Sequence, residues 1–199
     1  MTMSYNWFKV GLWVLGLFEI GVFIYVLEHI FSRRVKNQYP PVSCRSGHIR
    51  ALIREIRTHY PNAKVGVDIG AGVGRLARAV SRGTGMYIYG IENMPVSICV
   101  ARILNFLTGA TRVRMIYADA FEYLANYDGR FDIGIAYLGP GMNYMLGPIM
   151  SKFRVVITLD VEIPWLTPTR IIDAGGGYTR YHGVGKYPHR LFVYENAGC

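Results

Sequence analysis

The chain has 199 residues, of which 51% are hydrophobic, with a mean hydropathy of +0.20 and a formal net charge of +9. This length accommodates one domain with an extension, and the hydrophobic content is high for a purely soluble protein. The three cysteines (Cys44, Cys99 and Cys199) lie far apart, without a CxxC motif or a His/Cys cluster. This spacing excludes a disulfide framework and predicts no metal site.

The N-terminal part contains an apolar run over residues 10–27, interrupted only by Glu19. As a helix its 18 residues span roughly 27 Å, close to the ~30 Å core of a bilayer. Twelve of them are Leu, Ile, Val or Phe, whose insertion outweighs the roughly 2.5–3.5 kcal/mol that one central carboxylate costs. We therefore predict a retained transmembrane helix. A cleaved signal peptide is the alternative, but the run leads into the basic sequence SRRVK and not into a small-residue cleavage site.

Basic residues flank this run unevenly, because Lys9 precedes it and Arg33, Arg34 and Lys36 follow it. The positive-inside rule places the C-terminal domain in the cytoplasm, or in the matrix of a mitochondrion. Glu19 indicates a partner in the membrane, because an intramembrane acid usually faces another protein or a cavity. The predicted organisation is an anchor with its basic flank over 1–36, a turn-rich linker over 37–47 and a globular domain over 48–199.

The globular domain opens with an amphipathic pattern over residues 49–57, where isoleucine and leucine recur at helical spacing. Arg50, Arg54 and Arg57 stand between them, so the predicted helix has a basic outer face. That face is either solvated or in contact with anionic lipid head groups near the anchor. We expect no nucleic-acid partner, since no basic-aromatic motif accompanies the charge.

Strand and helix signals alternate through the rest of the chain. Strands are predicted at 64–69, 86–91, 112–117, 131–137, 153–159, 170–181 and 191–194, and helices near 74–82, 96–107, 120–126 and 142–150. This alternation predicts an α/β fold with a doubly wound, mostly parallel sheet. The glycine-rich tail predicts a C-terminal antiparallel hairpin.

The first predicted strand ends in VDIGAGVGR (residues 67–75), where three glycines stand at every second position. Glycines at that place allow a tight turn and the close approach of a ligand to the backbone. Arg75 stands where a GxGxxG dinucleotide motif would have its third glycine, and the GKS or GKT of a phosphate loop is absent.

Acidic residues end three successive strands, at Asp68, Glu92 and Asp119. The second can accept ribose hydroxyls and the third can meet an adenine amino group. Three carboxylates disfavour the pyrophosphate of NAD and suit a nucleoside with a cationic tail, which is S-adenosylmethionine. The alternative is that each acid only caps a strand or a helix. The predicted cofactor-binding residues are Asp68, Gly70, Gly72, Gly74, Glu92, Asp119 and Ala120.

In this order the glycine motif, the three acids and the late hairpin resemble class I S-adenosylmethionine-dependent methyltransferases, over about residues 43–196. The resemblance implies a Rossmann-like fold and an enzyme that uses S-adenosylmethionine.

A closer resemblance rests on the single transmembrane helix, its basic flank, a PPVS segment (40–43), a minimal core and PWLTP (164–168). Together these resemble the small membrane-anchored protein-lysine methyltransferases of mitochondria, which modify ATP synthase subunit c and the adenine nucleotide translocase. Members of that family commonly carry an acid in the glycine loop, where this chain has Val73, and their core is a little longer. The resemblance implies a membrane-protein substrate and a mitochondrial inner-membrane location with the domain in the matrix. A bacterial inner membrane with the domain on the cytoplasmic face is the alternative.

The segment after the fourth strand, AYLGPGMN (136–143), lacks the Pro-Pro-aromatic signature of DNA amino-methyltransferases and the carboxylate cluster of metal-dependent catecholate enzymes. The resemblance implies that Tyr137, Pro140 and Trp165 form the catalytic acceptor site, with Met142 and Tyr144 adding to its walls. A substrate lysine must lose its proton to be nucleophilic, which costs roughly 4–5 kcal/mol at pH 7, and desolvation in such a channel lowers its pKa. We expect no strong general base. Alternatively, the aromatic residues belong to the core.

Two other functions fit the sequence. The chain could methylate a lipid or a quinone, for which an anchor is equally useful. It could also be an inactive methyltransferase fold kept as a structural subunit of a membrane assembly, which Glu19 favours. The joint presence of the glycines and the three acids favours an active enzyme.

Overall fold

The computed structural model describes residues 44–181 and 185–195, except for the side chains of 180 and 181, together with residues 13, 15, 16, 18, 19 and 21–23. The chain divides into two compact units, Met1–Pro40 and Pro41–Cys199. The described residues of the first unit are helical. Among all the residues that the structure describes, no helix is long and apolar enough to cross a membrane. Most of the span predicted over 10–27 and all of its basic flank lie outside the described residues, so the anchor stays a prediction.

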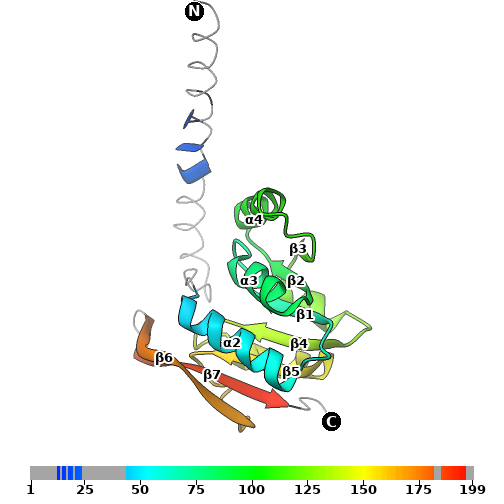
Figure 1. Cartoon of the computed structure of the whole chain (residues 1–199), viewed down its shortest axis with the longest axis vertical. Helices are drawn as coiled ribbons and strands as arrows, with labels where there is room; N and C mark the ends of the chain where they lie inside the picture. The colour runs from blue at the N-terminus through cyan, green and yellow to red at the C-terminus, as the bar shows by residue number, and fades with distance from the viewer. Residues whose placement is uncertain are drawn as a thin grey trace, which may run out of the picture. The chain divides into compact units, whose positions relative to one another are not determined.

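The second unit is built on one seven-stranded sheet with the order β3-β2-β1-β4-β5-β7-β6 (Figure 1). The strands are β1 (Val65–Ile69), β2 (Tyr87–Glu92), β3 (Val113–Tyr117), β4 (Phe131–Ala136), β5 (Phe153–Leu159), β6 (Arg170–Tyr181) and β7 (Gly185–Glu195). The first five are parallel, whereas β7 runs antiparallel to both β5 and β6. The predicted α/β fold with a mostly parallel sheet and a C-terminal hairpin is confirmed. Because the strand order reverses between β1 and β4, the carboxyl ends of these two strands form the topological switch point, where such sheets bind ligands.

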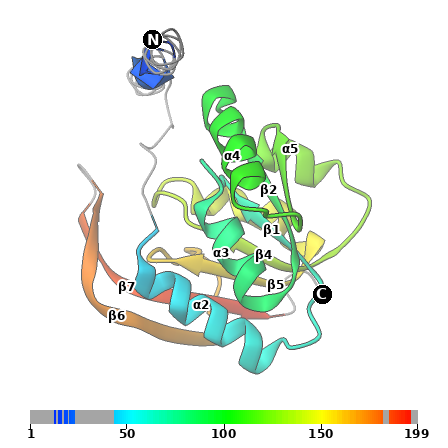
Figure 2. The same cartoon turned by 45° about the horizontal axis from the view of Figure 1, so that its top comes forward.

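Helices cover both faces of the sheet (Figure 2). They are α2 (Ser46–His59), α3 (Arg75–Thr84), α4 (Pro95–Leu107), α5 (Ala120–Ala125) and the 3-10 helix η1 (Asn143–Lys152). Each overlaps a helical segment predicted from the sequence. η1 contains Pro148, which has no N–H to donate along an α-helix, and this favours the tighter 3-10 winding there.

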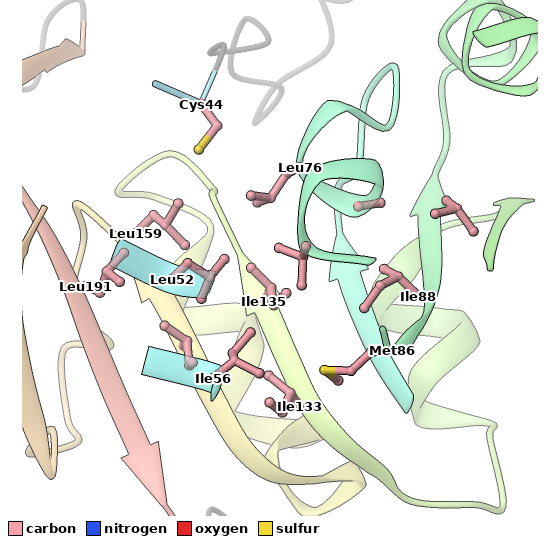
Figure 3. Packing of buried hydrophobic residues seen from close by; sticks show 14 of the residues in the cluster. Cys44, Leu52, Ile56, Leu76, Met86, Ile88, Ile133, Ile135, Leu159 and Leu191 are labelled. Carbon is pink, nitrogen blue, oxygen red and sulfur yellow. The ribbon is translucent and has the colours of Figure 1, made fainter. Parts of the chain in front are cut away.

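Two apolar layers, one on each face of the sheet, hold these elements together. On one face Leu52 and Ile56 of α2 pack over Ile133 and Ile135 of β4 and Leu191 of β7 (Figure 3). Burying a leucine or isoleucine side chain contributes about 1.5–3 kcal/mol. On the other face a second cluster joins η1 and α5 to the sheet.

The amphipathic helix predicted at the start of the domain is confirmed. Leu52 and Ile56 are fully buried, whereas Arg50, Arg54 and Arg57 are exposed on its outer face. The helix therefore closes the α2 face of the core and presents its arginines to the surroundings.

Candidate functional site

The glycine loop between β1 and α3 leaves bare backbone at the switch point. Gly70, Gly72 and Gly74 have φ values of +73°, +52° and +72°, which favour glycine. The N–H groups of Gly70 and Ala71 both donate to Ile91 O at 3.0 Å, which fixes the loop against the end of β2.

The three glycines differ in what surrounds them. A Cβ at Gly70 would come within 3.0 Å of Leu138 Cδ2, and one at Gly74 within 3.1 Å of Arg78 Nη1. At Gly72, in contrast, no heavy atom lies within 4 Å of an added Cβ. Gly72 is thus the place where the backbone borders open space and where a ligand can approach it.

Glu92 is buried and turns its carboxylate toward this loop. Its Oε2 accepts a hydrogen bond from Gly72 N at 2.7 Å, and its Oε1 accepts from Asn93 N at 2.9 Å and Met94 N at 3.0 Å. A carboxylate offers about four acceptor positions, so roughly one is left. The expectation that Glu92 accepts both hydroxyls of a ribose therefore requires one of these backbone bonds to be exchanged.

Asp68, at the end of β1, is a buried carboxylate whose Oδ2 accepts a hydrogen bond from Ala77 N at 3.1 Å. Burial raises the pKa of Asp68 to about 7; the nearby charge of Glu92 raises it further, and the Ala77 N–H opposes the rise. A cationic group placed beside Asp68 and Glu92 would lower the pKa of Asp68 again, because an opposite charge favours the ionised carboxylate. Both acids are buried at the carboxyl ends of β1 and β2, where a positively charged ligand would be favoured.

Asp119 has a structural role at the start of α5. Its Oδ1 accepts hydrogen bonds from Phe121 N at 2.9 Å and Glu122 N at 3.0 Å, which caps α5. Asp119 also borders a shallow groove with Ala118, Glu122, Tyr123, Asn126 and Tyr127. Ala120, the first residue of α5, is buried. Contact between Asp119 or Ala120 and an adenine stays a prediction.

The residues predicted for the acceptor site lie in different surroundings. Tyr137 directly follows β4 and packs against the core layer on the α2 face, and burial raises its pKa. Pro140 is half-buried in the turn that follows. Trp165 is 55% exposed, with its indole ring within 3.2 Å of the place where a Cβ on Gly147 of η1 would lie. Tyr144 is 48% exposed. An aromatic channel formed by these residues together stays a prediction.

A buried polar cluster beside Tyr137 was missed by the sequence analysis. Tyr137 OH donates to Asp160 Oδ2 at 3.1 Å, and Thr179 Oγ1 donates to the same oxygen at 2.6 Å. Asp160 Oδ1 lies 2.6 Å from His48 Nε2, and the ring of His48 lies edge-on to that of His189, with 4.8 Å between centroids. The sequence carried one signal for Asp160, which directly follows the apolar strand β5. Asp68 and Glu92 stand at the ends of their strands in the same way.

Cys44 is buried near the charges of both regions. Burial of its thiol raises the pKa of Cys44 to about 12; the nearby charges of Asp68 and Asp160 also raise it, and that of Arg75 lowers it. The glycine loop follows β1 and Asp160 follows β5, so both lie at the carboxyl ends of the parallel strands, with β4 between them.

Comparison with known proteins places the fold. No protein-family model matches the sequence, and no curated protein matches it either. An RNA methyltransferase from Salinibacter ruber, solved in complex with S-adenosyl-L-homocysteine, is 21% identical with a TM-score of 0.59, over 77% of this chain and 93% of that one. A proposed RNA methyltransferase from Pyrococcus horikoshii is 14% identical with a TM-score of 0.58, over 80% and 86%. TrmK of M. capricolum, solved with S-adenosyl-homocysteine, is 13% identical with a TM-score of 0.53, over 72% and 67%. The chain thus has the Rossmann-like fold of S-adenosylmethionine-dependent methyltransferases.

Proposed function

We propose that the chain is an S-adenosylmethionine-dependent methyltransferase. The observation that carries the proposal is the open backbone at Gly72, bordered by the carboxylate of Glu92 and close to buried Asp68. Neighbours of the same fold solved with S-adenosylhomocysteine support it.

The residues at the loop fit this cofactor chemically. S-adenosylmethionine supplies a methyl group carried on a positively charged sulfur. Gly72 allows close approach to the backbone, and the remaining acceptor position of Glu92 can receive a ribose hydroxyl. Burial destabilises the ionised form of Asp68, and a positive charge nearby would offset that destabilisation.

Calorimetric titration of the full chain with S-adenosylhomocysteine tests this assignment. Gly72→Arg fills the open space at the loop, and we expect it to weaken binding by at least about tenfold, or about 1.4 kcal/mol. Gly109→Arg is the matched control, because Gly109 also has a positive φ (+60°) and open surroundings but lies between α4 and β3, at the amino end of that strand. If both variants bind like the wild type, the ligand does not use this loop.

For the methyl acceptor we propose a lysine of a membrane protein. Support comes from the apolar run over 10–27 with its following basic residues and from the exposed arginines of α2, which suit anionic head groups. The location proposed with it is the mitochondrial inner membrane with the domain in the matrix, or a bacterial inner membrane with the domain in the cytoplasm. Glu19 is the proposed contact to a membrane partner.

RNA is the second candidate acceptor. Two of the structural neighbours named above carry RNA methyltransferase in their names, and the net charge of +9 suits a polyanion. Neither observation requires a membrane.

Transfer of a labelled methyl group separates these acceptors. Isolated membranes and total RNA are incubated in parallel with the full chain and labelled S-adenosylmethionine, and the products are identified by mass spectrometry. Methyl-lysine in a membrane protein supports the first acceptor. Label in RNA, or in a lipid or quinone, contradicts it. A protein that binds the cofactor and transfers nothing supports the scaffold alternative.

A further inference from the structure

Three buried side chains from distant parts of the sequence meet beside the end of β5. His48 comes from α2, Asp160 follows β5 and His189 belongs to β7. Each offers one potential ligand atom, and these atoms lie within 4.8 Å of one another. Their exposed fractions are 0%, 2% and 5%. The three side chains therefore form a buried polar cluster and not a solvated surface.

Two ring nitrogens of this cluster are not satisfied. His48 Nδ1 and His189 Nε2 are buried, and neither has a hydrogen-bond partner among the described residues. Such atoms are rare in proteins, and each costs about 1–3 kcal/mol when it lacks a partner. The unsatisfied Nε2 of His189, beside the buried His48–Asp160 pair, points to a ligand that accepts nitrogen and oxygen donors.

Two hydroxyl groups orient the carboxylate of Asp160. Its Oδ2 accepts from Thr179 Oγ1 at 2.6 Å and from Tyr137 OH at 3.1 Å, which leaves Oδ1 directed to His48. The Arg190 N–H also reaches Oδ1, at 3.3 Å. Outer hydrogen bonds of this kind orient the ligands of metal sites.

Two backbone features accompany the cluster, at Asp160 and at Gly177. Asp160 has a φ of +63° and is the sole non-glycine residue with a positive φ in the described part of the chain. Such strain persists where the surroundings impose it, commonly at functional sites. A Cβ at Gly177 would come within 3.1 Å of His189 Cε1, so a glycine there leaves room for the imidazole.

We propose that His48, Asp160 and His189 bind one divalent transition-metal ion. Two imidazoles and one carboxylate suit Zn²⁺ or Fe²⁺, whereas Mg²⁺ and Ca²⁺ prefer oxygen ligands alone. Ligand bonds of about 2.0–2.2 Å require donor atoms roughly 3.3 Å apart in tetrahedral geometry. The His48–Asp160 distance of 2.6 Å therefore lengthens as the ion replaces the shared proton, which is released to solvent. Three protein ligands leave a fourth coordination position open.

The opposing interpretation is a hydrogen-bonded His–Asp pair that fastens α2 to the sheet without a metal. It explains the 2.6 Å contact but not the unsatisfied Nε2 of His189. His48 Nδ1 lacks a partner in both interpretations, because the ion would bind His48 through Nε2. The metal site does not depend on the proposed methyltransferase activity, because none of its three ligands is among the residues proposed to bind S-adenosylmethionine or the methyl acceptor.

The test uses untagged full-length protein that has been freed of metal with a chelator. Because the ligands are buried, Co²⁺ or Zn²⁺ is added both to the folded protein and during refolding from denaturant. We expect one equivalent of Co²⁺ to bind with the visible absorption of a low-symmetry site, and Zn²⁺ to displace it, whereas Mg²⁺ does not. Absence of stoichiometric Co²⁺ and Zn²⁺ binding under both conditions overturns the proposal.

Variants locate the ion. His48→Gln and His189→Gln should each weaken Co²⁺ binding by at least about tenfold. Loss of a residue that only hydrogen-bonds to a metal ligand already lowers metal affinity by about 10–100-fold. His59→Gln is the control, since His59 lies on the same helix, is exposed and pairs with Glu55 at 3.1 Å; it should bind like the wild type. Unweakened binding in both test variants contradicts the assignment. If they fail to fold, X-ray absorption of the Zn²⁺-loaded wild type decides, because a shell without two imidazoles overturns the site.

Discussion

Replacing Asp68 by asparagine removes a carboxylate that the fold buries at the end of β1. The amide oxygen of the new side chain would still accept a hydrogen bond from the Ala77 N–H, which Asp68 binds at 3.1 Å, but the negative charge would be gone. The variant therefore isolates the cost of burying an ionisable group at the end of β1.

The magnitude and sign follow from the pKa of Asp68. Burial raises it to about 7, against ~3.9 in an unfolded chain. Each tenfold difference is worth 1.36 kcal/mol, so the full effect is about 4 kcal/mol. Because the folded pKa is the higher, stability is complete below pH ~4, falls as the pH rises toward about 7 and then levels off.

The assay is urea unfolding of the full chain between pH 4 and 8. We expect the wild type to lose up to about 4 kcal/mol over this range relative to Asp68→Asn, which should be the more stable protein at pH 8. Asp128→Asn, at an exposed position, serves as the control for a general change of charge. Parallel pH curves for the wild type and Asp68→Asn would refute the reasoning.

Three further substitutions test the packing. Leu52→Ala removes a fully buried side chain of α2 and should destabilise the domain by about 2–5 kcal/mol in urea unfolding; a smaller loss would mean that α2 is not docked as described. Phe106→Ala, at an 86% exposed position of α4, should change the free energy of unfolding by less than about 0.5 kcal/mol, and a large loss would place that side chain in an interface. Arg170→Met leaves the carboxylates of Glu55 and Glu195, at 2.9 and 2.8 Å from its Nη2, without their cation and should cost about 1–3 kcal/mol. An unchanged unfolding midpoint would show that this ion pair contributes nothing.

Local sequence patterns predicted the fold well, because they carry the physics of single elements. The periods of the apolar residues mark strands and the amphipathic helix, and alternating elements imply a parallel sheet. The glycines at 70, 72 and 74 predicted a tight turn, and the structure has positive φ at all three. The extent of β7 was harder to predict, since Lys186 and His189 interrupt its apolar pattern before Leu191.

The site could be predicted only in part, because its contacts depend on tertiary structure. Asp68 and Glu92 were found from their places at strand ends, but the sequence does not reveal that backbone N–H groups take up most of the acceptor capacity of Glu92. His48 and His189 are 141 positions apart and meet only because α2 packs beside β7. The exposure of Trp165 likewise depends on how η1 and the segment after β5 pack, which no local pattern specifies.

A structure of the full chain in complex with S-adenosylhomocysteine tests the central claim most directly. We expect the ligand over the backbone of Gly72, with a ribose hydroxyl within hydrogen-bond distance of Glu92 and the sulfur on the side of Tyr137. Ligand bound elsewhere, or a carboxylate of Glu92 that keeps all three backbone bonds and touches no ligand atom, would contradict it.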